Sequence, residues 1–192
     1  MICHVNKFIF VHIPKCGGTT IENIFNGWHK WKTNDKLIGE NRQHYKLTQI
    51  LELNPSCNNY FRFTFIRNPY DRIVSEYHYL KRKFPEKVKI TFKEFCADLD
   101  RNLDLYAGHY HKLTMVDYFD NYPVDFIGRV ETMQRDWDVI CELIGIPFNE
   151  LKKENTTKHK HYTEYYDDET RQIVADKYSK DLEYFGYEFQ PK

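Results

Sequence analysis

Short apolar runs alternate with segments of helical periodicity along this chain. Residues 8–13 (FIFVHI) form a nearly continuous apolar run that ends at Pro14, which is typical of a strand buried on both faces of a parallel sheet. Residues 60–66 (YFRFTFI) alternate phenylalanines with polar side chains, and residues 125–130 (DFIGRV) form a shorter apolar run. The pattern predicts three strands spread along the chain.

Segments with helical periodicity separate these strands. The first predicted helix begins at Thr19, the second follows Asn68-Pro69, the third starts at a Thr91–Glu94 capping box, the fourth spans 131–144 and stops at Gly145, and the last begins near Asp167. Strands interleaved with helices predict an α/β fold, a three-layer sandwich around a central parallel sheet. The sequence has no internal repeat and no Gly/Ser linker, so we expect a single domain over residues 1–192.

The composition narrows the class of protein. The 192 residues are 41% hydrophobic and 17% aromatic, which excludes a disordered chain, a collagen-like fibre and a coiled coil. The 28 Lys and Arg residues balance 28 Asp and Glu residues. A net charge of zero argues against a general nucleic-acid or membrane-surface binder, because such proteins usually carry a basic excess. Any anion must therefore be bound by locally placed cations.

The compartment is predicted from what the sequence lacks. No apolar stretch approaches the roughly 20 residues that a membrane span needs, and the N-terminus has no small-residue cleavage site. The five cysteines are odd in number, scattered, and form no C-x-x-C pair. We therefore expect a cytoplasmic protein with reduced thiols. The oligomeric state is not indicated by the sequence.

The stretch 12–20 (HIPKCGGTT) lies where the first strand ends and the first helix begins. Gly17 and Gly18 allow a tight turn whose N–H groups point into one concavity, and Lys15 adds a positive charge, so a phosphate or sulfate group is the expected guest. Lys15 precedes the glycines, whereas the nucleotide triphosphatase signature places its lysine after them. A tight turn without a ligand remains the alternative interpretation.

A second candidate segment follows the strand at residues 60–66. Arg67 comes directly after this strand, at the carboxyl end where open α/β sheets bind ligands, and Ser75 lies about two turns into the next helix. An arginine in this place can hold a phosphate with two hydrogen bonds. The alternative is that Arg67 pairs with Asp71 and that Ser75 is a small packing residue.

Together, the two segments resemble a known family. HIPKCGGTT is similar to the 5′-phosphosulfate loop of sulfotransferases, and FTFIRNPYDRIVSEY is similar to their 3′-phosphate segment. The similarity is greatest to the branch of carbohydrate and heparan sulfate O-sulfotransferases and their small soluble bacterial relatives, and it extends over nearly the whole chain. The resemblance implies a P-loop NTPase-like fold and 3′-phosphoadenosine 5′-phosphosulfate as the sulfuryl donor.

The resemblance also assigns residues to the donor. Lys15 is expected at the 5′-phosphosulfate and its bridging oxygen, and the turn formed by Cys16, Gly17, Gly18, Thr19 and Thr20 is expected to hold the 5′-phosphate. Arg67 and Ser75 are expected to bind the 3′-phosphate. Lys158 and Lys160 are expected to close over it, and an exposed basic loop is the alternative for these two. The family commonly has Thr or Ser where this chain has Cys16, so a reactive thiol is a minor alternative there.

The resemblance points to His44 as the general base that deprotonates the acceptor hydroxyl. From the residues alone, His12 next to the turn ranks equally. A carbohydrate hydroxyl is the acceptor that the resemblance implies. The aromatic stretch 106–122 either lines a sugar cleft or belongs to the core.

No metal site is expected. The pairs His109/His111 and His159/His161 lack further ligands at recognisable spacing, and a transferring sulfuryl group carries less charge than a phosphoryl group. Two other functions remain open at this point. One is a P-loop nucleotide kinase-like phosphotransferase, and the other is a non-catalytic nucleotide-binding protein of the same fold.

Overall fold

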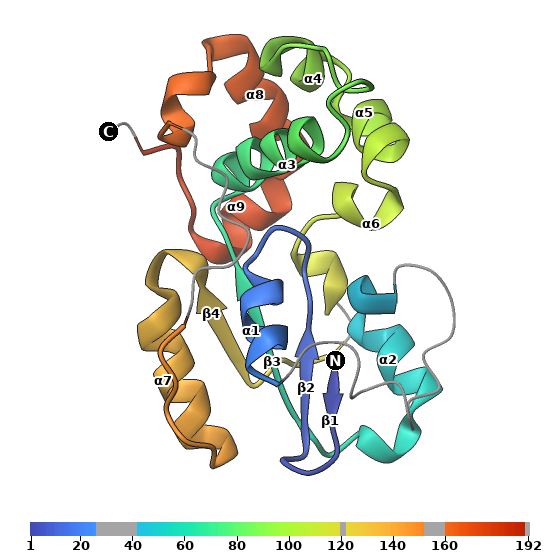
Figure 1. Ribbon diagram of the computed structural model, residues 1–192, viewed down its shortest axis with the longest axis vertical. Helices are drawn as coiled ribbons and strands as arrows, with labels where there is room; N and C mark the ends of the chain where they lie inside the picture. Colours follow the sequence, from blue (N-terminus) through green and yellow to red (C-terminus); the bar gives the residue numbers. More distant parts are fainter. Residues whose placement is uncertain (26–41, 120–121, 152–159, 191–192) are drawn as a thin grey trace. The chain divides into compact units, whose positions relative to one another are not determined.

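The computed structural model describes residues 1–25, 42–119, 122–151 and 160–190. The chain forms two compact units (Figure 1). Unit 1 comprises residues Met1–Ile66 and Asp117–Asn155, and unit 2 comprises Arg67–Val116 and Thr156–Lys192. The single domain expected from the sequence stays a prediction.

Unit 1 is built on a four-stranded, mostly parallel sheet (Figure 1). Its strands are β1 (Ile2–Cys3), β2 (Phe8–Val11), β3 (Phe61–Ile66) and β4 (Phe126–Arg129), in the order β1-β2-β3-β4. β2, β3 and β4 are parallel to one another, which confirms the α/β class. β1 is an antiparallel edge strand that the sequence analysis missed, because two residues carry no periodicity.

Phenylalanines dominate the core of unit 1. Phe10 on β2 lies opposite Phe63 on β3, and their ring centroids are 5.1 Å apart. The ring centroid of Trp137 lies 6.4 Å from that of Phe63 and 6.1 Å from that of Phe25. The helix that carries Trp137 and the helix that ends just before Phe25 therefore cover the same face of the sheet. The alternating pattern of residues 60–66 thus supplies one buried face.

The helices of unit 1 follow the predicted strands. They are α1 (Gly18–Ile24), α2 (Leu47–Leu53) and α7 (Met133–Ile144), with short 3-10 turns η2 (Arg42–His44), η3 (Pro55–Cys57) and η5 (Val130–Thr132). A further turn, η4 (Val116–Tyr118), spans the boundary in sequence between the two units. Gly145 ends α7 in the left-handed conformation, with φ 67°, as its sequence predicts. The predicted continuation of α1 through Trp28 lies outside the described residues.

Unit 2 is helical. It contains α3 (Pro69–Lys83), α4 (Phe92–Ala97), α5 (Leu99–Tyr106), α6 (His109–Lys112), η6 (Tyr162–Tyr165), α8 (Asp168–Lys177) and α9 (Ser179–Phe185). The last two elements correct the sequence analysis, which predicts one final helix. Tyr178 separates them with a non-helical ψ of 24°, and its side chain is fully buried in the core of this unit.

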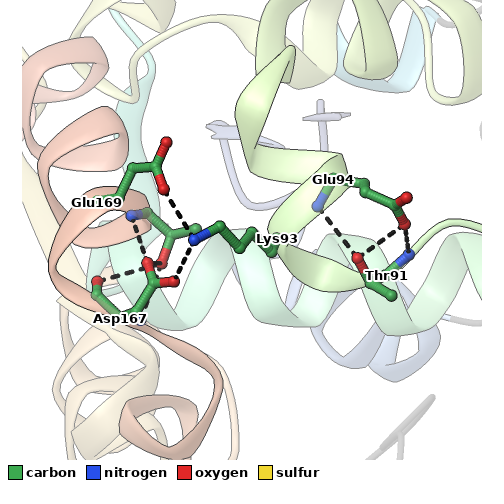
Figure 2. A network of polar contacts seen from close by, with 6 residues as sticks. Thr91, Lys93, Glu94, Asp167 and Glu169 are labelled. Atoms are coloured by element: carbon green, nitrogen blue, oxygen red, sulfur yellow. Dashed lines mark hydrogen bonds and ion pairs between the residues drawn. The ribbon is translucent and has the colours of Figure 1, made fainter.

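Polar contacts join α4 to the start of α8 (Figure 2). Lys93 Nζ lies 2.9 Å from a carboxylate oxygen of Asp167 and 2.8 Å from one of Glu169. On the other side of α4, the Thr91 hydroxyl accepts from the N–H of Glu94, and the Glu94 carboxylate accepts from the N–H of Thr91. The predicted capping box is therefore confirmed.

Two buried charged residues hold the segment 111–116 inside unit 2. The Arg72 guanidinium is 1% exposed and donates to the carbonyl oxygens of Leu113, at 2.9 Å, and His111, at 3.4 Å. Asp181 is fully buried and accepts from the N–H groups of Met115 and Val116. Paired in this way, both charges satisfy backbone groups that would otherwise be costly to bury.

All five cysteines lie among the described residues, and each is a buried thiol outside any disulfide. Burial raises the pKa of Cys96 to about 12 and that of Cys141 to about 11, so both stay protonated at neutral pH. Within the described part of the chain, no helix is long and apolar enough to cross a bilayer.

Candidate functional site

The turn after β2 has an unusual backbone. Lys15 has φ 66° and Gly17 has φ 77°, so two of three consecutive residues are left-handed. Glycine adopts this conformation at no cost, whereas a lysine there is strained by roughly 1–2 kcal/mol. A strained non-glycine residue inside a glycine turn is typical of a functional position.

Close packing requires glycine at position 18, whereas the left-handed φ favours it at position 17. A Cβ on Gly18 would lie 2.1 Å from Cδ2 of His12, and a Cβ on Gly17 would lie 2.8 Å from the terminal methyl carbon of Met133. The turn is therefore pressed between the end of β2 and the start of α7. No larger residue fits at either position without displacing a neighbour.

The turn offers backbone donors. The N–H of Cys16 donates to the Ile13 carbonyl at 3.3 Å, and the N–H of Thr20 donates to the Gly17 carbonyl at 3.0 Å. The three N–H groups between them, at residues 17–19, have no acceptor among the described residues. Lys15 and Thr19 are half-buried beside them, and Thr20 is buried. This donor set fits a phosphate or sulfate group.

The structure brings the predicted base to the same place. The Nδ1 atom of His44 lies 3.1 Å from the carbonyl oxygen of His12, and the two imidazole rings meet edge to face with centroids 4.7 Å apart. His12 is the residue that leads from β2 into the turn. His12 and His44 thus form one cluster of unit 1 at the start of the turn, and both histidines are buried.

Hydrogen bonds define the form of the His44 imidazole. A carbonyl oxygen only accepts, so Nδ1 of His44 carries the proton in its contact with His12. The other nitrogen, Nε2, lies 3.1 Å from the side-chain amide nitrogen of Gln43 and accepts from it. The neutral ring therefore presents its lone pair at Nε2, which is the atom that a general base would use.

Cys16 is 1% exposed. The minor alternative of a reactive thiol requires access to solvent or substrate, and burial disfavours it. The contribution of Cys16 to the turn is its place in the backbone between Lys15 and Gly17.

The second segment lies in unit 2, at the start of α3. Asn68 caps this helix by accepting from the N–H of Tyr70, and Pro69 occupies its first position. Nε of Arg67 lies 2.7 Å from a carboxylate oxygen of Asp71, so the ion pair that the sequence analysis left open is present. Ser75 is buried one helical turn beyond Asp71. A guanidinium carries five N–H donors, so this ion pair is compatible with a phosphate contact.

The late basic loop is described only in part. Lys158 lies outside the described residues. Lys160 belongs to unit 2, where its exposed ammonium group lies 3.7 Å from the Glu164 carboxylate and its N–H donates to the Tyr165 hydroxyl. The contact of these lysines with a nucleotide stays a prediction.

The aromatic stretch 106–122 divides between core and surface. Met115, Tyr118 and Phe119 are buried, which supports the core interpretation for its second half. Tyr106 and Tyr110 are half-buried in unit 2. The described residues of this stretch therefore do not form a continuous exposed aromatic surface.

One histidine of each pair has a polar partner of its own. Nδ1 of His111 lies 2.7 Å from the Glu76 carboxylate, and Nδ1 of His161 lies 2.8 Å from the Thr163 hydroxyl. His159 lies outside the described residues. Within the ranges that the structure describes, no group of three or more His, Cys, Asp or Glu side chains is arranged to hold a metal ion.

Two residues of the cluster escaped the sequence analysis. Glu22 on α1 lies 2.8 Å from Nδ1 of His12, through its Oε1 atom, and Gln43 contacts Nε2 of His44. At about 100° per residue, Glu22 lies beside the apolar stripe of α1 that carries Ile21 and Ile24, not on it. Neither Glu22 nor Gln43 is therefore marked out by the sequence.

Comparisons with known proteins identify a family and several relatives of this chain. The chain matches the Sulfotransferase family over residues 1–188. It is 26% identical to carbohydrate sulfotransferase 9 from Homo sapiens over 212 residues, covering 92% of this chain and 46% of that protein. It is 20% identical to carbohydrate sulfotransferase 11 from Mus musculus over 183 residues, covering 73% and 51%.

A third relative is an uncharacterized protein from Archaeoglobus fulgidus, 34% identical over 95 residues, which cover 47% of this chain and 72% of that protein. No solved structure matches the chain significantly. The chain spans about half the length of the two carbohydrate sulfotransferases. Because the family match covers nearly the whole chain, this protein belongs to the sulfotransferase family.

Proposed function

We propose that this protein transfers a sulfuryl group from 3′-phosphoadenosine 5′-phosphosulfate to an acceptor hydroxyl by in-line displacement. The observation that carries the proposal is the contact of His44 with the His12 carbonyl. It places a neutral imidazole beside the turn that holds Lys15 and three backbone N–H groups without a described acceptor. A base and a set of anion donors are the two parts that such a transfer needs.

Lys15 and the turn act on the leaving group. The attack of the acceptor oxygen on sulfur breaks the bond to the bridging oxygen, and negative charge develops on the nucleotide phosphate. Lys15, with the N–H groups of Gly17, Gly18 and Thr19, stabilises this charge. The hydroxyls of Thr19 and Thr20 and the backbone of Cys16 complete the 5′-phosphate site. Loss of one such donor costs on the order of 3 kcal/mol in the transition state.

His44 takes the proton of the acceptor hydroxyl at Nε2. The Gln43 amide occupies this nitrogen in the structure, so the acceptor hydroxyl replaces the amide when it binds. A base of this kind accounts for roughly 100- to 10,000-fold in rate.

The 3′-phosphate distinguishes this donor from ATP, and the resemblance assigns four residues to it. Arg67 supplies the guanidinium, held at Nε by Asp71, and Ser75 supplies a hydroxyl. Lys158 and Lys160 add positive charge. This assignment rests on the resemblance of FTFIRNPYDRIVSEY to the family's 3′-phosphate segment.

The order of strands and helices along the chain supports a proposal for the fold family. We infer a three-layer, P-loop NTPase-like sandwich, because β2 leads through the glycine turn into α1 and the parallel strand β3 leads into α3. The reaction proposed here uses Lys15 and backbone donors for charge stabilisation, so we expect it to proceed in the presence of a chelator.

A carbohydrate hydroxyl is the proposed acceptor. Two relatives of this chain are named carbohydrate sulfotransferases, and the chain covers about half the length of each. The charge balance of 28 cations against 28 anions favours a small or neutral glycan over a long polyanion.

Two measurements test the proposal. Thermal stabilisation by 3′-phosphoadenosine 5′-phosphate is compared with that by ATP, and protection by ATP alone contradicts the donor assignment. The protein is then incubated with sulfur-labelled donor and a mixture of neutral glycans. Labelled glycan supports the proposal, whereas nucleotide binding without transfer to any hydroxyl supports a non-catalytic binding protein.

A further inference from the structure

The proposed mechanism leaves one buried His–Glu hydrogen bond of unit 1 without a role. Nδ1 of His12 lies 2.8 Å from Oε1 of Glu22, and the two side chains are only 7% and 6% exposed. Since a carboxylate accepts and does not donate, the proton of this bond is on His12. Burying two such groups is costly, and apolar residues would fill the same space at lower cost. Because stability does not explain the His12–Glu22 pair, we look for a role of this pair in the site.

His12 makes three contacts that matter for the site. Its ring lies against Gly18, where a Cβ would approach Nε2 to 2.2 Å. Its ring also meets the edge of the His44 ring at an interplanar angle of 80°. Its carbonyl oxygen accepts the Nδ1 proton of His44. One residue thus touches both the anion-binding turn and the proposed base.

Glu22 fixes the orientation of that residue. The imidazole of His12 is attached to the backbone through two rotatable bonds, and the hydrogen bond to Glu22 selects one rotamer and one tautomer. The same bond anchors the end of β2 to α1. The carbonyl of His12 is held in place as a consequence.

We propose that Glu22 and His12 are positioning residues that set the tautomer and orientation of His44. The arrangement follows the logic of a catalytic triad, in which a third group accepts from Nδ1 of the base and leaves its Nε2 lone pair toward the substrate. Here the third group is a backbone carbonyl, and the Glu22–His12 bond holds it. The functional part of this inference rests on the proposed role of His44. The structural part does not.

Nitrogen-15 NMR of the histidine rings tests the structural part directly. Long-range proton–nitrogen correlations distinguish the Nδ1–H from the Nε2–H tautomer, and the spectra of His44→Asn and His12→Asn assign the two residues. In the wild-type protein at neutral pH, both rings are expected as the Nδ1–H tautomer. Observation of His44 as the Nε2–H tautomer overturns the proposal.

Three variants separate positioning from general stability. Glu22→Leu removes the acceptor of His12, and His44 is expected to lose its single tautomer and to show averaged nitrogen shifts. Glu22→Gln keeps an acceptor oxygen and is expected to restore the wild-type pattern. The double variant His12→Phe/Glu22→Leu replaces both partners with apolar groups of similar size, so it is expected to fold even where Glu22→Leu does not. It is expected to show the same loss at His44.

The chain supplies a matched control. Glu76 and His111 in unit 2 form a second, partly buried His–Glu pair, with Nδ1 and Oε2 2.7 Å apart. Glu76→Leu is expected to lower the melting temperature while the His44 pattern stays unchanged. If the double variant folds and retains the wild-type His44 pattern, or if Glu76→Leu disturbs His44 as strongly, the proposal is wrong.

Turnover links the result to function. With sulfur-labelled donor and neutral glycans, the double variant is expected to lose about tenfold or more in kcat, because a base displaced by about 1 Å loses rate steeply. Affinity for 3′-phosphoadenosine 5′-phosphate is expected to be retained. If the wild-type protein sulfates no acceptor, the proposed function fails, while the NMR result still decides the positioning role.

Discussion

Gly18 and the ring of His12 are in contact so close that a Cβ on Gly18 would lie 2.1 Å from Cδ2 of the imidazole. Gly18 begins α1 and has an ordinary helical backbone, so this contact, rather than φ, requires the glycine. The ring cannot rotate away without breaking its bond to Glu22.

The first prediction concerns this contact. Gly18→Ala is expected to lower the free energy of unfolding by about 2 kcal/mol, in the range typical of overpacking. Urea denaturation measures the change. The double variant His12→Ala/Gly18→Ala removes the obstructing ring, so its loss is expected to be smaller than the sum of the two single losses. Additive losses would show that the two residues do not compete for the same space.

Two substitutions of Lys15 distinguish the effect of its charge from the effect of its strained backbone. Lys15→Gly removes the ammonium group and relieves the positive φ, whereas Lys15→Ala removes the charge and keeps the strain. Both variants are expected to lose sulfuryl transfer. In denaturant melts, Lys15→Gly is expected to be more stable than Lys15→Ala by roughly 1 kcal/mol. Equal stability would show that residue 15 does not adopt the left-handed conformation in solution.

Gln43 is expected to compete with the acceptor. Gln43→Leu removes the amide that donates to Nε2 of His44. A single hydrogen bond contributes about 1 kcal/mol, so kcat/KM for the acceptor is expected to rise by up to about fivefold, with kcat little changed. Steady-state kinetics at saturating donor measure both. A tenfold fall in kcat/KM would instead assign Gln43 to substrate binding.

The contacts of Asp167 predict a dependence of stability on pH. Hydrogen bonds from Thr170 and the nearby ammonium group of Lys93 hold the pKa of the Asp167 carboxyl well below its usual value. A lowered carboxyl pKa adds stability at pH values above the unfolded-state pKa, and this stability is lost as the pH falls through the folded-state pKa.

Asp167→Asn tests this dependence. The difference in melting temperature between wild type and Asp167→Asn is expected to be constant from pH 7 to about pH 5, and to shrink as the pH falls below about 4. Glu86→Gln, which loses an exposed pair with Lys89, serves as the control and is expected to show little difference at any pH. A difference for Asp167→Asn that is independent of pH would remove the electrostatic explanation.

Local signals made much of the fold predictable. The apolar run at residues 8–13 and the alternating run at 60–66 have periods that depend only on neighbouring residues, and both became parallel strands. The Thr91–Glu94 box and the Gly145 stop are also local. The break between α8 and α9 was not predictable, because burial of Tyr178 among residues distant in sequence decides it.

The candidate site shows the same division. The glycine turn was visible because Lys15, Gly17 and Gly18 are consecutive. The Glu22–His12 bond and the Gln43–His44 bond were not, since each is a side-chain contact that requires the folded backbone. The left-handed φ of Lys15 also follows from the tertiary structure, because lysine has no preference for it.

The interleaving of the two units along the chain has a consequence for synthesis on the ribosome. Unit 1 lacks its last strand, β4, and α7 until residues 126–144 have emerged, and unit 2 lacks α8 and α9 until the final residues are made. Neither core can close on a contiguous N-terminal piece. The aromatic side chains of β3 and α3 therefore stay exposed while the intervening residues are made, when aggregation competes with folding. Expression at low temperature or with co-expressed chaperones is expected to raise the yield of folded protein.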